Sequence, residues 1–288
     1  MSTLTEHELQ EIARANASGL QPVLFVHGLW LLPSSWDRWR ALYEQHGYTT
    51  IAPGWPDDPA TVAEAREHPE AFAKTSLKLI AAHYAEAIRA LTIKPVLVGH
   101  SFGGMLAEEL AGEGLSAATV AIDPAPFRGV LPLPASSLKS SAAVLNNPAN
   151  YSRAVSLTFD QFKYGWANEL DEKEAKELYE EFHVPGSGRP LFSAAFANIN
   201  PWTEDRVDTT NPERGPLLLI SGEKDNTVPW ALVSAAYQRQ LRNSGETEVR
   251  QIPDRGHSLV IDHGWQEVAE CALAFVKEYV PAIVPAKD

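Results

Sequence analysis

The sequence predicts an α/β protein whose parallel sheet is covered by helices on both faces. Short apolar runs rich in β-branched residues alternate with longer amphipathic runs up to residue 122. The same pattern returns at residue 217 and continues to residue 279. The clearest strand–turn–helix junction, residues 95–111, lies within this alternation. Such an order of strands and helices is typical of βαβ units with parallel strands.

Six apolar runs are expected to be strands, because each is too short for a helix and is followed by turn residues. They cover residues 22–26, 48–52, 95–98, 118–122, 217–220 and 248–252. The first run begins only at Pro22, which leaves little room for earlier strands. We therefore expect a parallel core of six strands.

Apolar residues spaced three and four positions apart predict the helices. These cover residues 5–15, 34–46, 72–91, 105–111, 230–241 and 265–279, with one further helical turn in the polar segment 57–69. In the first helix we expect Leu9, Ile12 and Ala13 to form the apolar face.

The alternation breaks between residues 125 and 213. Prolines cluster at the start of this segment, and helical pieces such as 171–182 follow without intervening strands. Aromatic residues are frequent here, which favours a helical lid over a pocket. We therefore expect a core domain formed by residues 20–124 and 214–280, with residues 125–213 as a helical cap.

Residues 95–104 join a valine-rich apolar run to a Gly-x-Ser-x-Gly pattern and the start of a helix. A serine in this context lies on a strained turn that presents its hydroxyl above the sheet. Gly99 and Gly103 are needed because side chains would collide across the tight turn. Ser101 is therefore the candidate nucleophile.

Three more motifs follow other predicted strands, at residues 27–28, 221–225 and 256–257. The carboxyl ends of parallel strands lie at one edge of a sheet, so we expect these motifs to converge near the serine. A serine hydroxyl is a weak nucleophile at neutral pH and needs a nearby base, for which His257 is the candidate. Asp225 would hold the imidazole in the required tautomer.

With these motifs in this order, the chain resembles the α/β-hydrolase superfamily over roughly residues 20–124 and 214–280. The resemblance implies the α/β-hydrolase fold, a mostly parallel sheet flanked by helices, with a variable cap. It also implies an oxyanion hole formed by the backbone N–H groups of Leu29 and Phe102. Some family members carry the acid after the preceding strand, which makes Asp123 the alternative acid.

Other residues near the expected site receive secondary interpretations. Trp30, beside the predicted oxyanion hole, and Phe127 and Trp166, in the predicted cap, are candidate walls of a substrate pocket. Asp254 is interpreted as a turn residue and Asp262 as a surface residue.

The histidines of the two turns, His27 and His100, are interpreted as structural hydrogen-bonding residues. The sequence contains neither a His-Glu-x-x-His motif nor a Cys–His cluster. We therefore expect no metal and no cofactor.

We expect a serine hydrolase that cleaves a carboxylic ester or lactone through an acyl-enzyme at Ser101. The aromatic cap favours a small to medium, apolar substrate. An amidase, a carbon–carbon bond hydrolase, a hydroxynitrile lyase or a perhydrolase shares this fold and triad, so these chemistries stay open. The other alternative is a hydrolase-fold receptor that binds a ligand with slow turnover.

The overall composition limits the classes of partner. The formal net charge is −13 and no basic stripe is present, which disfavours nucleic acid. Neither a bilayer-spanning stretch nor a secretory signal is apparent, so we expect no membrane partner. The single cysteine, Cys271, is expected to be a structural thiol, in keeping with a reducing, cytoplasmic location. We expect a small-molecule substrate, and assembly into a homo-oligomer stays open.

Overall fold

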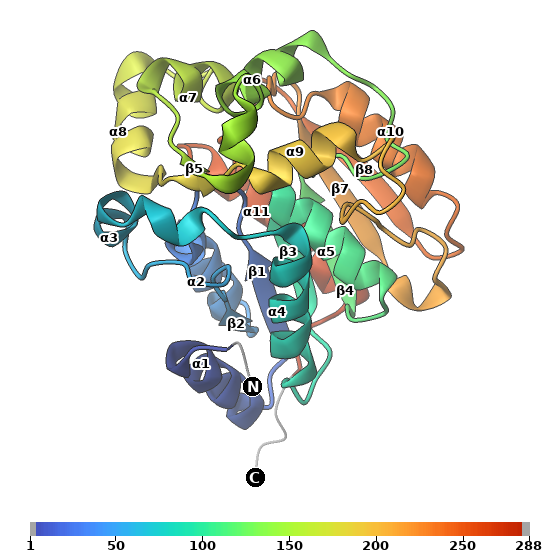
Figure 1. Ribbon diagram of the computed structural model, residues 1–288. Coiled ribbons are helices and arrows are strands. Elements are labelled where there is room, and N and C mark those ends of the chain that lie inside the picture. Colours follow the sequence, from blue (N-terminus) through green and yellow to red (C-terminus); the bar gives the residue numbers. More distant parts are fainter. Residues whose placement is uncertain (1–3, 284–288) are drawn as a thin grey trace.

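Six parallel strands form the central sheet of the computed structural model, which describes residues 4–283 (Figure 1). Their spatial order is β2-β1-β3-β4-β7-β8, and each neighbouring pair in the described chain is parallel. The predicted α/β class and six-stranded parallel core are confirmed. The strands are β1 (Pro22–Val26), β2 (Thr49–Ile51), β3 (Val96–His100), β4 (Ala118–Ile122), β7 (Leu217–Gly222) and β8 (Thr247–Ile252).

The four central strands are buried along their whole length, as expected for a parallel sheet with helices on both faces. In the middle of the sheet, Val98 of β3 lies opposite Phe25 of β1 and Val120 of β4. Strand β8 is an edge strand, and most of its side chains are only partly buried or exposed. Because the central strands are parallel neighbours, their carboxyl ends lie side by side, directly before the sequence motifs.

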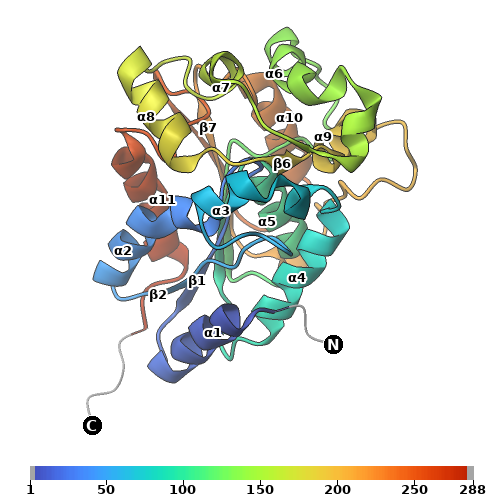
Figure 2. The same cartoon turned by 60° about the vertical axis from the view of Figure 1, so that its left-hand side comes forward.

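Helices cover both faces of this sheet (Figures 1 and 2). Helices α2 and α11 contact each other on one face, and α4 and α5 contact each other on the opposite face. No helix of the described residues is both long and apolar enough to cross a bilayer. The helices outside the cap are α1 (Glu6–Ser18), α2 (Asp37–Gln45), α3 (Val62–Glu67), α4 (Leu77–Arg89), α5 (Phe102–Gly112), α10 (Trp230–Gln240) and α11 (Trp265–Tyr279), with the 3-10 helices η1 (Pro33–Trp36) and η2 (Pro69–Phe72). A third 3-10 helix, η4 (Pro212–Arg214), lies at the junction of the cap and the core.

The segment between β4 and β7 contributes no strand to the central sheet in the described structure. Its helices gather beyond the carboxyl ends of the central strands (Figure 1), and we call residues 125–213 the cap. The cap contains α6 (Ala135–Leu145), η3 (Pro148–Ser152), α7 (Phe159–Gly165), α8 (Glu172–Phe182), α9 (Arg189–Phe196) and a two-stranded antiparallel sheet of β5 (Ala154–Val155) and β6 (Gly186–Ser187).

The buried face of α1 differs from the predicted one. Leu9 is 47% exposed, whereas Glu8 and Glu11 are buried beside Ile12. Glu8 faces inward because its carboxylate bonds the Nε2 atom of His83 at 2.8 Å. A buried carboxylate with a specific partner therefore overrides the apolar periodicity.

The predicted helix 72–91 is shorter than expected and begins at Leu77. Phe72 instead ends the separate 3-10 helix η2 and is buried in a small second core. Ser76 caps α4, with its hydroxyl accepting the Leu79 N–H at 3.4 Å. A serine cap at this position satisfies an amide at the helix start and sets the boundary.

Gly103→Ala is expected to lower the free energy of unfolding by about 3 kcal/mol or more, the upper end of the usual cost of overpacking. A Cβ at this position would lie 2.1 Å from the Val26 carbonyl oxygen, which is backbone and cannot turn away. Denaturant unfolding measures the change. The matched control is Gly104→Ala, whose Cβ would meet Pro124 at 3.1 Å. Equal losses in the two variants would contradict the close approach of α5 to β1.

Candidate active site

The turn between β3 and α5 holds Ser101 in a strained backbone conformation. Ser101 has φ 57° and ψ −122°, a region that residues with a side chain rarely occupy. Its N–H donates to the Ile122 carbonyl oxygen at 2.9 Å, and its carbonyl oxygen accepts two amides at the start of α5. A Cβ at Gly99 would lie 2.1 Å from the Gly103 carbonyl oxygen, so the turn requires glycine there. This is the conformation that the Gly-x-Ser-x-Gly pattern predicts.

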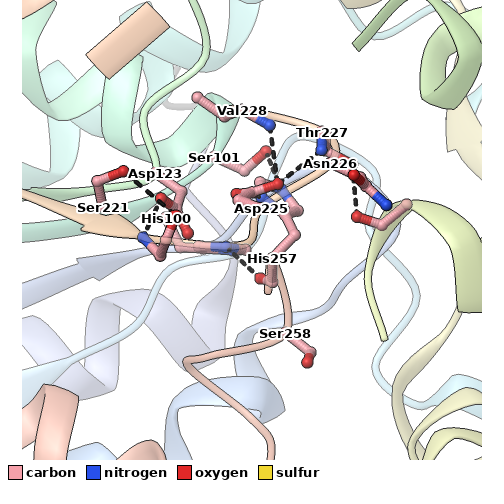
Figure 3. A network of polar contacts seen from close by, with 12 residues as sticks. His100, Ser101, Asp123, Ser221, Asp225, Asn226, Thr227, Val228, His257 and Ser258 are labelled. Atoms are coloured by element: carbon pink, nitrogen blue, oxygen red, sulfur yellow. Dashed lines mark hydrogen bonds and ion pairs between the residues drawn. The ribbon is translucent and has the colours of Figure 1, made fainter. Parts of the chain in front are cut away.

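The structure brings Ser101, His257 and Asp225 together (Figure 3). His257 Nε2 lies 3.0 Å from Ser101 Oγ, and His257 Nδ1 lies 2.6 Å from Asp225 Oδ2. The His257 and Asp225 side chains are both fully buried. Three residues that are distant in the sequence thus form one continuous hydrogen-bonded chain.

The hydrogen bonds around His257 select one imidazole tautomer. An ionised Asp225 can only accept, so Nδ1 carries the proton and Nε2 keeps its lone pair for the Ser101 hydroxyl. The other carboxylate oxygen, Oδ1, accepts the backbone N–H groups of Thr227 at 2.6 Å and Val228 at 2.9 Å. This arrangement can accept a proton from Ser101 as its oxygen attacks an electrophile, and can later return that proton.

His100 supports His257 from the end of β3. Its Nε2 atom donates to the His257 carbonyl oxygen at 3.0 Å, and the two ring centroids lie 4.6 Å apart. Burial, followed by the neighbouring His257, lowers the pKa of His100 well below its usual value, so the ring is neutral. These contacts agree with a structural role for His100.

Asp123, the alternative acid, follows β4 and lies beside Asp225. Its Oδ1 atom accepts the Gly222 N–H at 2.8 Å, whereas the Nδ1 atom of His257 bonds Asp225. Burial, followed by the negative charge of Asp225, raises the pKa of Asp123 well above its usual value. The geometry therefore favours Asp225 as the acid that orients the histidine.

The turn after β1 lies against the serine. A Cβ on Gly28 would lie 2.9 Å from the Ser101 Cβ, so only a glycine permits this approach. Leu29 directly follows this glycine. Phe102 is the first residue of α5, where amides have no carbonyl partner within the helix. The N–H groups of Leu29 and Phe102 thus belong to the residues that flank the reaction site, and their action as an oxyanion hole stays a prediction.

A sequence model of the alpha/beta hydrolase family matches residues 23–271. The chain belongs to this family. All three members of the hydrogen-bonded chain, Ser101, Asp225 and His257, lie within the matched region. A comparison with curated protein sequences found no match.

Solved structures of several hydrolases have the same fold. A monoacylglycerol lipase from Paleococcus ferrophilus is 18% identical with a TM-score of 0.62, over 90% of this chain and 94% of that chain. An extracellular alpha/beta-hydrolase from a Paenibacillus species is 17% identical with a TM-score of 0.64, over 88% and 98% of the two chains. A thermophilic esterase from Thermogutta terrifontis is 16% identical with a TM-score of 0.62, over 90% of each chain. At these identities the likeness shows the fold alone.

The candidate pocket walls of this alpha/beta hydrolase occupy three different settings. The Trp166 and His257 rings form a T-shaped contact, with centroids 4.7 Å apart and an interplanar angle of 83°. Trp30 lines a cavity of about 10 Å³, and its indole N–H donates to the Val155 carbonyl oxygen in the cap at 2.9 Å. Phe127 is buried in the main core. Such a cavity holds about one water molecule, so the contact of these side chains with a substrate stays a prediction.

Residues 164–168 of the cap bind the loop that carries Asp225. The Asn226 amide donates to the Tyr164 carbonyl oxygen at 3.0 Å, and the Thr227 hydroxyl donates to the Gly165 carbonyl oxygen at 2.7 Å. Asn168 donates to the Lys224 carbonyl oxygen at 2.9 Å. The loop that orients the histidine is therefore held on its outer side by the cap.

The same cap segment also binds the loop that carries His257. The Ser258 N–H donates to the Trp166 carbonyl oxygen at 3.0 Å. A Cβ on Gly256 would lie 2.7 Å from Asn168 Oδ1, so glycine allows the two segments to approach. These contacts could not be predicted from the sequence, because backbone carbonyls at the end of a cap helix carry no sequence signal.

A buried ion pair corrects the interpretation of Asp262 as a surface residue. Asp262 is 2% exposed, pairs with Arg255 and accepts the Ser258 hydroxyl at 3.1 Å. The interpretation was wrong because this loop has no periodic pattern from which burial could be inferred. Asp254, in contrast, has φ 53°, as expected for a residue in a tight turn.

His27 lies in the turn after β1 and bonds a residue of the polar segment 57–69. Its Nε2 atom lies 3.0 Å from Asp58 Oδ2, and its ring stacks on Trp55 with centroids 5.1 Å apart. Asp58 also accepts the Trp55 N–H at 2.8 Å. These contacts agree with the structural role expected for His27.

His100, Asp123 and His257 each offer a ligand atom within 4.8 Å of the others. Both nitrogens of His257 are already engaged, with Asp225 and with Ser101. The Nε2 atom of His100 is engaged with a backbone carbonyl. The cluster therefore fits a network of polar side chains better than a metal centre.

Proposed function

We propose that this alpha/beta hydrolase is a cofactor-independent serine hydrolase that cleaves a carboxylic ester or lactone. The observation that carries the proposal is the continuous chain from Ser101 Oγ through the His257 imidazole to Asp225, with contacts of 3.0 and 2.6 Å. This is the set of groups that nucleophilic acyl transfer requires. The folds shared with a monoacylglycerol lipase and an esterase support an ester substrate.

In the proposed first half of the reaction, Ser101 Oγ attacks the ester carbonyl carbon while its proton passes to His257 Nε2. The negative charge on the carbonyl oxygen is stabilised by the N–H groups of Leu29 and Phe102. The carbon–oxygen bond to the leaving group then breaks, and the alkoxide takes the proton from Nε2. An acyl-enzyme on Ser101 and a free alcohol result.

In the second half, water attacks the acyl carbon and gives one proton to His257 Nε2. The bond between the acyl group and Ser101 Oγ breaks, and Oγ takes that proton back. The carboxylic acid leaves and the enzyme returns to its starting state. Asp225 stays ionised throughout and stabilises the imidazolium that forms twice in the cycle.

Aromatic side chains around the site support a small to medium, apolar acyl group. Trp166 lies against the imidazole, with ring centroids 4.7 Å apart. The other chemistries that use this triad, on amides, carbon–carbon bonds, cyanohydrins or peroxides, stay open as alternatives. A receptor with slow turnover is the alternative from a different class.

A fluorophosphonate probe and a panel of esters test the proposal. We expect the probe to label Ser101, identified by mass spectrometry of the modified peptide. We also expect turnover of short p-nitrophenyl esters or lactones, with a burst of p-nitrophenol if deacylation is slow. Labelling without turnover of any ester or lactone would favour the receptor or another triad chemistry. Absence of labelling would overturn the assignment of the nucleophile.

A further inference from the structure

Two buried carboxyl groups lie near the His257 ring, at the carboxyl ends of β4 and β7 (Figure 3). The Asp123 carboxyl lies within 4.8 Å of a ring nitrogen of His257, and Asp225 bonds the same ring at 2.6 Å. Asp225 belongs to the proposed triad. Asp123 is fully buried and has φ 40°, which is a strained backbone conformation for a residue with a side chain. The bond from the Gly222 N–H and the surrounding burial hold the Asp123 carboxyl group in place, yet the proposed reaction assigns it no task.

The two carboxyl groups have unequal sets of hydrogen-bond donors. Asp225 accepts the N–H groups of Thr227 and Val228 and the Nδ1–H of His257. Asp123 Oδ1 accepts the Gly222 N–H, and Oδ2 meets no donor within the described residues. Donors stabilise the ionised form of a carboxyl group, so the charge belongs on Asp225.

If Asp123 were ionised beside Asp225, the site would carry two negative charges. Among the described groups that affect the pKa of Asp123 there is no lysine or arginine to compensate the second charge. The titratable groups that surround Asp123 are Asp225 after β7, His257 after β8 and the neutral His100 at the end of β3. Two adjacent buried carboxylates beside one imidazole would repel each other in a medium of low polarity. A proton on Asp123 removes this repulsion and supplies the donor that Oδ2 otherwise lacks.

We propose that Asp123 is a neutral carboxylic acid that donates its O–H to the Asp225 carboxylate and thereby positions the acid of the triad. This inference rests on the proposed function of Ser101, His257 and Asp225. The O–H bond fixes the rotamer of Asp225 and moderates its negative charge. Asp123 is therefore a positioning residue that acts on His257 through Asp225.

The activity test compares Asp123→Leu with Asp123→Asn. The leucine removes the donor to Asp225, and we expect kcat/KM for p-nitrophenyl acetate to fall about 10- to 100-fold, as for a lost hydrogen bond to a charged group. The acid limb of the pH profile should move to higher pH, because the uncompensated carboxylate holds the imidazolium more strongly. The asparagine should restore most of the activity, since its amide donates to Asp225 while its oxygen accepts from Gly222.

A second test uses thermal unfolding and requires no turnover. A folded-state pKa raised above the unfolded value means that Asp123 contributes stability at low pH, which is lost as the pH rises through the folded pKa. Asparagine needs no proton, so the Tm of Asp123→Asn minus that of the native chain should grow as the pH rises above about 4. This test stands even if Asp123→Leu does not fold.

Glu108→Gln is the matched control. Burial raises the pKa of Glu108 to about 8. Its carboxyl group accepts a hydrogen bond from the Gln240 amide, and Gln240 is not a residue of the triad. We expect the same growth of the Tm difference with pH, without a shift of the pH–rate profile.

A Tm difference for Asp123→Asn that shrinks or stays constant as the pH rises would overturn the inference, as would a loss of activity equal to that of Asp225→Asn. If no ester is turned over, the proposed function fails and the thermal test alone decides the state of Asp123.

Discussion

Ser101→Ala is expected to lower kcat for ester hydrolysis by about 10⁴-fold or more, while the protein stays folded. The hydroxyl is the atom that forms the acyl-enzyme, and it is the partner of His257 Nε2 at 3.0 Å. Alanine keeps the Cβ and the strained turn, so the neighbouring glycine contacts are unaffected. Steady-state assays with a p-nitrophenyl ester give kcat, and circular dichroism with thermal unfolding reports the fold.

Ser116→Ala is a suitable control for this variant. Ser116 is also a buried serine, but it precedes β4 at the opposite end of the strand, where its hydroxyl donates to the Ala118 carbonyl oxygen at 2.6 Å. This variant should retain kcat even if it loses some stability. Retained turnover in Ser101→Ala would mean that a different group attacks the substrate.

Asp225→Asn is expected to lower kcat by about 10⁴-fold, since the amide imposes the wrong tautomer on His257. The Asp225 Oδ1 position accepts two backbone N–H groups, from Thr227 and Val228. The amide oxygen would take that position, and the NH₂ group would then face Nδ1. The imidazole would keep its proton on Nε2 and could no longer accept one from Ser101. The pH dependence of kcat in native and variant chains measures the effect.

The comparison with Asp123→Asn makes this prediction sharper. Both substitutions replace a buried carboxyl group at the end of a neighbouring strand, so general effects of the amide should be similar. Only Asp225 bonds the imidazole, at 2.6 Å. A larger loss from Asp123→Asn would identify Asp123 as the acid of the triad.

Much of the core could be predicted from the sequence, because the signals there are local. The apolar runs that become β1, β3, β4 and β7 are buried on both faces, and each ends at or directly before a glycine, histidine or aspartate. The turn around Ser101 is specified by two glycines whose replacement would cause backbone clashes. Such steric requirements leave a direct trace in the sequence.

Other features could not be predicted, because they depend on long-range polar contacts. Glu8 turns inward on α1 to bond His83, and Asp262 is buried to pair with Arg255. In each case a charged residue finds its partner through the tertiary fold, and hydrophobic periodicity gives no indication of it. The proposed bond between Asp123 and Asp225 also depends on the tertiary fold, since the two residues follow strands whose adjacency only the sheet order reveals.

The contacts of residues 164–168 have a consequence for changing the specificity of this hydrolase. This short stretch joins the loops of Asp225 and His257 through backbone carbonyls, so a graft of a foreign cap would also replace part of the scaffold that aligns the catalytic groups. An engineer who exchanges the cap should keep these residues and place the junctions on either side of them. For the same reason, a motion that admits a bulky ester must bend the chain outside residues 164–168. A displacement of this stretch would pull the loops of Asp225 and His257 out of alignment.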